Sequence, residues 1–226
     1  MSDLGFTHVF EAGKDGWTLL LLHGTGGDER DLVGLGRQLA PGAALLSPRG
    51  KVLENGVSAR FFRRLAVGQL DIPDLLMRTD ELAAFVGAAA DRYELDPQRM
   101  IALGFSNGAN IAVSLLLRHP SLLRGAALLR PMLPYEPAEP PPLEDVDVLV
   151  AAGSHDPYSP PQQSARLVQM LRDGGARVTA HTEPGAGHGL TQNDIAHTAR
   201  WLAGVTAPPV AFTRSCPPHS PPSGLR

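Results

Sequence analysis

The feature that most constrains this chain is the segment GFSNG at residues 104–108. It follows the apolar run 100–103 and precedes residues 109–117, whose apolar spacing predicts a helix. A G-x-S-x-G segment between a strand and a helix is typical of a sharp turn that exposes the serine. The chain closes on itself at such a turn, so both flanking positions need a small residue. We therefore expect Ser106 to be a nucleophile, with a glycine-rich turn and a helix-capping serine as the structural alternative.

A nucleophilic serine needs a base to take its proton and an acid to orient that base. Residues 146–153 read as a buried strand that leads to Asp156. Residues 177–183 alternate like a strand and lead to His188. Because loops after parallel strands open at the same edge of a sheet, these two side chains are predicted to meet Ser106 there.

The loop HGTGGDE at residues 23–29 follows a third apolar strand, residues 17–22. A glycine-rich loop in this place can turn an N–H group toward the serine. We predict that the backbone N–H groups of Thr25 and Asn107 form an oxyanion hole, since Asn107 begins a helix whose dipole favours negative charge. The alternative is a phosphate-binding turn. The loop lacks a following Lys-Ser or Lys-Thr and does not complete G-x-G-x-x-G.

Other histidines and carboxylates fit this chemistry less well. His23 is expected to pack the glycine-rich loop, and Asp145 and Asp147 sit at the start of their strand and so lie at the wrong edge. No pair of histidines has the H-E-x-x-H spacing of a zinc hydrolase. The predicted reaction needs no metal and no organic cofactor.

These segments together resemble the phospholipase/carboxylesterase family of α/β-hydrolases. The matching stretches are residues 23–29, 104–110 (GFSNGAN), 155–157 (HDP) and 187–189 (GHG). Residues 47–56, 60–64 and 129–134 are similar to the bacterial carboxylesterase branch linked to hydroquinone and quinone stress. The resemblance covers roughly residues 5–204.

The resemblance implies an α/β-hydrolase fold, with a mostly parallel central sheet, helices on both faces and no large separate lid domain. It implies Ser106, Asp156 and His188 as the catalytic triad. The family includes acyl-protein thioesterases, small bacterial carboxylesterases and many dimers, so a homodimer is a possible assembly. Thioesterase members usually carry Gln after the nucleophile, where this chain has Asn107.

Composition agrees with a globular enzyme. The 226 residues are 43% apolar and 19% charged, with a net charge of −3, so no affinity for nucleic acid is expected. The sequence has no run of 18 or more apolar residues, so no stable membrane insertion is expected. No signal peptide is evident. The only cysteine, Cys216, favours a cytoplasmic location. We expect one domain at 1–206 and a proline-rich, disordered tail at 207–226.

Strands and helices alternate along the chain, as in a parallel sheet. Further strands are expected at residues 6–10, 43–47 and 125–129, and helices at 32–39, 74–93, 162–171 and 191–202. Residues 49–69 and 130–142 read as irregular segments that shape the substrate pocket.

Substrate contacts are expected from those irregular segments. Phe61, Phe62, Met132 and Leu133 could line an apolar site, although the two phenylalanines fit ordinary packing equally well. Arg49 and Arg130 could bind a carboxylate or phenolate, although such arginines more often pair with nearby acids. 

The predicted function is a serine carboxylesterase that hydrolyses small, short-acyl or aromatic esters through an acyl-serine intermediate. Alternatives are an acyl thioesterase or lysophospholipase with the same triad, and a catalytically idle α/β-hydrolase that binds a ligand.

Overall fold

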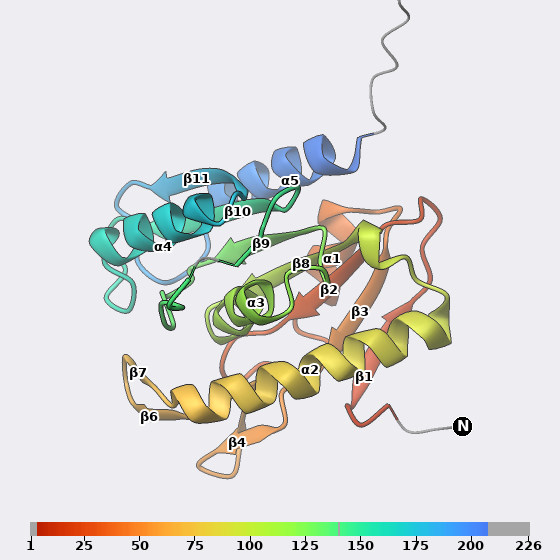
Figure 1. Ribbon diagram of the computed structural model, residues 1–226, viewed down its shortest axis with the longest axis horizontal. Coiled ribbons are helices and arrows are strands. Elements are labelled where there is room, and N and C mark those ends of the chain that lie inside the picture. The colour runs from red at the N-terminus through yellow and green to blue at the C-terminus, as the bar shows by residue number, and fades with distance from the viewer. Residues whose placement is uncertain (1–3, 140, 208–226) are drawn as a thin grey trace, which may run out of the picture.

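A seven-stranded sheet forms the centre of the computed structural model, which describes residues 4–139 and 141–207 (Figure 1). The strand order is β1-β3-β2-β8-β9-β10-β11. Their bounds are β1 His8–Glu11, β2 Thr18–Leu22, β3 Ala44–Pro48, β8 Met100–Phe105, β9 Gly125–Leu129, β10 Asp147–Gly153 and β11 Arg177–Glu183.

Only β1 runs antiparallel to its neighbour, β3, and every other pair in this sheet is parallel. The loops that follow the six parallel strands therefore open at one edge. This arrangement confirms the predicted α/β-hydrolase class with a mostly parallel sheet.

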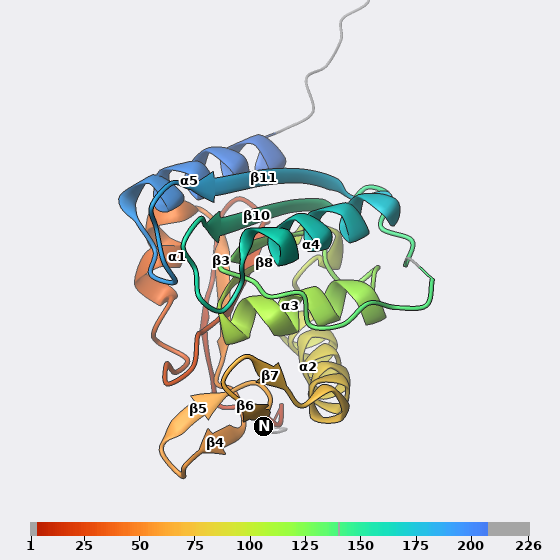
Figure 2. The ribbon, with the colours of Figure 1, turned by 90° about the vertical axis from the view of Figure 1, so that its left-hand side faces the viewer.

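Helices cover both faces of the sheet (Figures 1 and 2). Helices α2, α3 and α4 pack on one face, and α1 and α5 pack on the other. Their bounds are α1 Val33–Leu39, α2 Ile72–Tyr93, α3 Asn107–Arg118, α4 Pro161–Asp173 and α5 Gln192–Thr206, with a short 3-10 helix at Pro97–Arg99. The expected helices are present, with ends that differ by a few residues.

Alternation along the strands divides the core into two parts. In β2, Leu20 and Leu22 point into the core beneath α2 and α3, whereas Leu19 and Leu21 point into the core beneath α1. Each leucine is 1% exposed or less, because both faces of the sheet are covered. This burial explains why the strand reads as a continuous apolar run rather than an alternating one.

Local side chains fix where two helices begin. The Asp71 carboxylate accepts a hydrogen bond from the N–H of Asp74 at the start of α2. Thr191 and Asp194 form a reciprocal capping box at the start of α5. Asp194 has a second contact, described below, that joins this helix to the site.

Residues 49–69 are more regular than the sequence suggested. They form two small hairpins, β4 Val52–Glu54 with β5 Ser58–Arg60, and β6 Arg64–Ala66 with β7 Gln69–Leu70. Figure 2 shows both hairpins beside α2, at its N-terminal end. The turn of the first hairpin carries Asn55 and Gly56, both with positive φ. Asn-Gly is a common hairpin signal, but the flanking strands have only three residues each, which made the hairpin hard to recognise in the sequence.

No separate lid domain occurs within the described residues, and none of their helices is long and apolar enough to cross a membrane. The predicted tail lies outside the described residues from 208 onward, as does Cys216.

Candidate active site

Ser106 lies at the turn between β8 and α3, with φ 52° and ψ −113°. This left-handed φ is uncommon for a residue with a side chain, and it turns the serine out of both elements. A Cβ at position 104 would lie 2.6 Å from the Gly108 carbonyl oxygen, and a Cβ at position 108 would overlap the carbonyl of Leu22. Both positions therefore require glycine, which accounts for the GFSNG pattern.

The structure brings Ser106, His188 and Asp156 into one chain of hydrogen bonds. His188 Nε2 lies 2.8 Å from Ser106 Oγ, and His188 Nδ1 lies 2.8 Å from Asp156 Oδ2. The Asp156 side chain is 1% exposed, whereas that of His188 is 24% exposed. The other Asp156 oxygen accepts the N–H of Tyr158 at 2.9 Å, so both carboxylate oxygens have partners. This order of contacts can transfer a proton from a serine to a histidine.

The backbone N–H groups of Thr25 and Asn107 are among those near Ser106 that have no hydrogen-bond acceptor within the described residues. The Thr25 loop is fixed nearby, because the N–H of Gly26 donates to the carbonyl of Ala59 at 2.9 Å. Free donors on a fixed loop and at a helix N-terminus are the groups that an oxyanion hole requires.

The His23 side chain holds the glycine-rich loop of residues 23–29 in place. Its Nδ1 lies 2.7 Å from the Gly24 carbonyl oxygen, and its Nε2 accepts the N–H of Gly50 at 3.0 Å. An Nε2 that accepts is unprotonated, so the ring is neutral. Burial lowers the pKa of His23, which favours the same neutral form. His23 is thus built into the loop, as expected, and lies outside the chain of contacts to Ser106.

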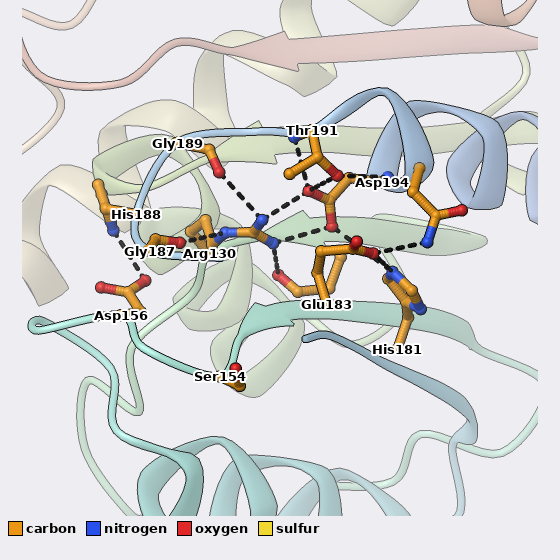
Figure 3. A network of polar contacts seen from close by, with 12 residues as sticks. Arg130, Ser154, Asp156, His181, Glu183, Gly187, His188, Gly189, Thr191 and Asp194 are labelled. Carbon is orange, nitrogen blue, oxygen red and sulfur yellow. Dashed lines mark hydrogen bonds and ion pairs between the residues drawn. The ribbon is translucent and has the colours of Figure 1, made fainter. Parts of the chain in front are cut away.

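Arg130 fixes the loop that carries His188 (Figure 3). Its Nε donates to the Gly187 carbonyl and its Nη2 to the Gly189 carbonyl, both at 3.0 Å. The same guanidinium pairs with both carboxylate oxygens of Asp194, at 3.0 and 2.5 Å. Arg130 therefore contacts the residues on either side of His188 and ties them to α5.

The cavity beside Ser106 has a volume of about 210 Å³. It is lined by Thr25, Arg60, Arg64, Gly68, Leu70, Phe105, Ser106, Asn107, Asn110, Met132, Tyr158 and His188. The lining combines the residues of the predicted site with side chains from both hairpins. Such a volume suits a small organic substrate better than a long chain.

Several expected substrate contacts are corrected by the structure. Met132 lines the cavity, but Leu133 packs against the core instead. Phe61 and Phe62 are 2% and 0% exposed and belong to the core, which was the alternative interpretation.

The two arginines expected to bind substrate have other partners. Arg130 is completely buried against Asp194 and cannot reach a substrate. Arg49 pairs with Glu29 at 2.5 and 2.9 Å and does not line the cavity. The arginines that do line it, Arg60 and Arg64, come from the arginine-rich segment 60–64.

Two further lining residues carried weaker signals in the sequence. Asn110 follows Ser106 by four residues, about one helical turn, a spacing that places it near Ser106. Tyr158 lies two residues after Asp156, and its ring centroid is 4.8 Å from that of His188.

One cluster away from the serine has the residue types of a metal site. Ligand atoms of His181, Glu183 and Asp194 lie within 4.8 Å of one another. Both Asp194 oxygens already bond to Arg130, so a cation would have to displace a buried guanidinium. The geometry therefore favours a network of hydrogen bonds and ion pairs that stabilises the fold, and not a metal site.

The chain is similar to known hydrolases over nearly its whole length. MhqD of Bacillus subtilis (strain 168), described as a hydrolase, is 45% identical over 194 residues, which cover 86% of this chain and 96% of MhqD. A family model, that of the prolyl oligopeptidase family, matches residues 128–207, which include Asp156 and His188.

Solved structures agree with this similarity. The Bacillus cereus carboxylesterase is 44% identical, with a TM-score of 0.85 over 88% of this chain and 94% of the other. YahD, solved with malic acid, is 32% identical, with a TM-score of 0.83 over 88% of this chain and 99% of the other. With this fold and these relatives, the chain belongs to the phospholipase/carboxylesterase family of α/β-hydrolases.

Proposed function

We propose that this protein is a serine carboxylesterase that hydrolyses small carboxylic esters through an acyl-serine intermediate. The observation that carries the proposal is the continuous contact from Ser106 Oγ through His188 to Asp156, with 2.8 Å at each step. The carboxylesterase among the similar structures supports the same class of hydrolase. The proposal adds that Ser106 is the attacking residue and that His188 takes its proton.

In the proposed mechanism, His188 Nε2 takes the Ser106 proton as Oγ attacks the ester carbonyl carbon. The Asp156 carboxylate stabilises the imidazolium that forms and keeps Nδ1 protonated. The N–H groups of Thr25 and Asn107 donate to the oxyanion. His188 then gives its proton to the alcohol as the C–O bond breaks, leaving an acyl group on Ser106.

Water completes the cycle. It loses a proton to His188 as it attacks the acyl carbonyl, and the returning proton frees Ser106 and releases the carboxylic acid. Protons and bonds balance without any external reductant or metal. Apart from the ester and water, the cycle uses only groups that this chain supplies.

The dimensions of the cavity support a small substrate. About 210 Å³ leaves room for a short acyl group and a small alcohol, and Leu70, Phe105 and Met132 supply apolar surface. YahD, a similar structure, was solved with malic acid, a small carboxylic acid, which supports a small substrate here.

Hydrolysis of p-nitrophenyl esters with acyl chains of two to sixteen carbons tests the proposal, on the wild type and on Ser106→Ala. We expect the highest kcat/KM with short chains and no turnover above background in the variant. A maximum at long chains would favour an acyl thioesterase or lysophospholipase. No turnover that depends on Ser106 at any length would leave a ligand-binding protein as the better description.

A further inference from the structure

Leaving His188 aside, the charged side chains that line the cavity beside Ser106 are both cationic. Arg60 and Arg64 line it, and no carboxylate does, within the part of the chain that the structure describes. The ester group itself carries no net charge, and the reaction described above needs no arginine. The two guanidinium groups therefore require a separate explanation.

Arg60 is a buried cation with incomplete pairing. Its side chain is 4% exposed, its Nε donates to the Phe62 carbonyl at 3.1 Å, and its Nη1 donates to Thr25 Oγ1 at 2.6 Å. Both partners are neutral, and the carboxylate of Glu54 lies 3.9 Å away. Among the described residues, Arg60 Nη2 has no hydrogen-bond acceptor. A buried charge whose counter-ion is 3.9 Å away and shared with Arg64 gains from a ligand of opposite charge.

Arg64 does not relieve this excess, because it uses the same carboxylate. Its Nε and Nη2 donate to both oxygens of Glu54, at 2.7 and 2.9 Å. These hydrogen bonds lower the pKa of Glu54, so it is ionised at neutral pH. Two arginines thus share one carboxylate, and two positive charges against one negative charge leave a net charge of one positive beside the cavity.

Two amide side chains that line the cavity, those of Asn107 and Asn110, have their oxygens engaged within the protein. The Asn107 side-chain oxygen accepts the N–H of Phe61 at 2.7 Å, and the Asn110 oxygen accepts the N–H of Met132 at 2.8 Å. Each amide therefore keeps its NH₂ group as the remaining hydrogen-bonding group, and this group is a donor. The Asn107 Nδ2 is buried and has no hydrogen-bond partner among the residues that the structure describes. A buried donor without an acceptor costs free energy that a substrate oxygen can recover.

We propose that this cavity selects esters that carry a free carboxylate, namely monoesters of small dicarboxylic acids, with Arg60 and Arg64 binding the second carboxylate. The inference rests on the proposed esterase function and adds the substrate class. A carboxylate supplies only acceptors and a negative charge, which complement two guanidinium groups and two amide NH₂ groups. In this proposal, Arg60 and Arg64 make the arginine–carboxylate contact that the sequence suggested for Arg49 and Arg130.

The free carboxylate belongs to the acyl part of the ester. His188 gives its proton to the leaving alcohol, so the alcohol lies on the side of His188, next to Phe105 and Tyr158. Arg60 instead bonds to Thr25 on the oxyanion loop. The acyl chain is the part that can extend toward that loop and on to Arg64.

The test compares two esters that differ in charge, monomethyl glutarate and dimethyl glutarate, with acid release followed by titration at constant pH. We expect the wild type to prefer the monoester by about tenfold or more in kcat/KM, a typical gain for a charge-assisted contact. This ratio should fall toward one in Arg64→Gln. It should rise in Glu54→Gln, because that variant removes the counter-ion of both arginines.

Opposite effects on one ratio separate recognition of charge from damage to the fold, since a misfolded variant loses activity on both esters. Arg118→Gln is the matched control. Arg118 also pairs bidentately with a carboxylate, that of Asp80, but it lies at the far end of α3 from Ser106. Its ratio should equal that of the wild type.

The outcomes distinguish this inference from the function on which it rests. A wild-type ratio of one or less, with turnover of dimethyl glutarate that is lost in Ser106→Ala, would overturn the charge selectivity and leave the esterase intact. A preference for the monoester that persists in Arg64→Gln would also overturn it. Failure of both esters and of all p-nitrophenyl esters would overturn the proposed function itself.

Discussion

Arg130 and Asp194 form an ion pair in which both side chains are completely inaccessible to solvent. The pair joins the residue after β9 to the first turn of α5, and the same guanidinium bonds to the carbonyl groups on either side of His188 (Figure 3). Hydrogen bonds from Arg130 and Thr191 outweigh burial and lower the pKa of Asp194. The position of His188 thus depends on a contact that takes no part in the reaction.

Asp194→Asn should therefore impair both stability and catalysis. Removing one partner leaves the Arg130 charge buried and uncompensated, which typically costs about 3–5 kcal/mol. Urea unfolding measures the loss, and kcat on p-nitrophenyl acetate should fall because the His188 loop loses its support. Asp80→Asn is the control, since Asp80 is 46% exposed and its pairing should contribute less than about 1 kcal/mol. Equal losses in both variants would contradict the account.

Stability should decline in mild acid because His23 is built in as a neutral ring. Burial lowers its pKa in the folded protein, whereas in the unfolded chain the pKa is about 6.5. The unfolded state therefore binds the proton first as pH falls. The stabilisation is complete above about pH 6.5 and is lost as pH falls from there through the folded pKa.

Urea unfolding from about pH 8 to pH 5 checks this contribution, in a range set by the ordinary histidine pKa. His23→Gln, which cannot titrate, should show a shallower loss of stability than the wild type. His155→Gln serves as control, because His155 is exposed and should leave the slope unchanged. If the free energy of unfolding of His23→Gln depends on pH as steeply as that of the wild type, another group causes the loss of stability.

Asp156 and Asp147 provide a matched pair of carboxylates on one strand and its following loop. Asp156 bonds to His188, whereas Asp147 lies at the other end of β10 and pairs with Arg124 and Arg177. Asp156→Asn should lower kcat by about 10³–10⁴-fold with little change in KM, because the histidine loses its orientation and its counter-charge. Asp147→Asn should retain kcat. Steady-state kinetics in which the two variants lose kcat equally would refute the assignment.

The turn at Ser106 should tolerate no side chain at position 108. A Cβ there would overlap carbonyl groups at the end of β2, so Gly108→Ala should destabilise the protein by about 1–3 kcal/mol. Gly87 has open space around it in α2, and Gly87→Ala should stabilise by about 0.5–1 kcal/mol through helix propensity. Thermal unfolding of the two variants gives the comparison, and a tolerated Gly108→Ala would mean that the turn is looser than described.

The sequence predicted the sheet and its helices well, because long apolar runs and helical spacing are local signals. It also predicted which loops hold Ser106, Asp156 and His188, since parallel strands place such loops at one edge. The hairpins in residues 49–69 were missed because their strands have two or three residues each, too few to establish alternation.

The partners of the arginines could not be predicted from the sequence. Arg130 and Asp194 are 64 residues apart, and only the packed fold brings them together. Arg60 and Arg64 share Glu54 across the two hairpins, a relationship that depends on how short strands pair. Both are tertiary contacts that leave no periodic pattern in the chain.

The central claim, that Ser106 is a nucleophile activated by His188, is tested most directly by labelling with a fluorophosphonate followed by peptide mass spectrometry. The account predicts one adduct on the peptide that contains Ser106, at a rate that drops sharply in His188→Gln, and no adduct in Ser106→Ala. An unlabelled Ser106 in folded wild-type protein, or labelling at the same rate without His188, would contradict it.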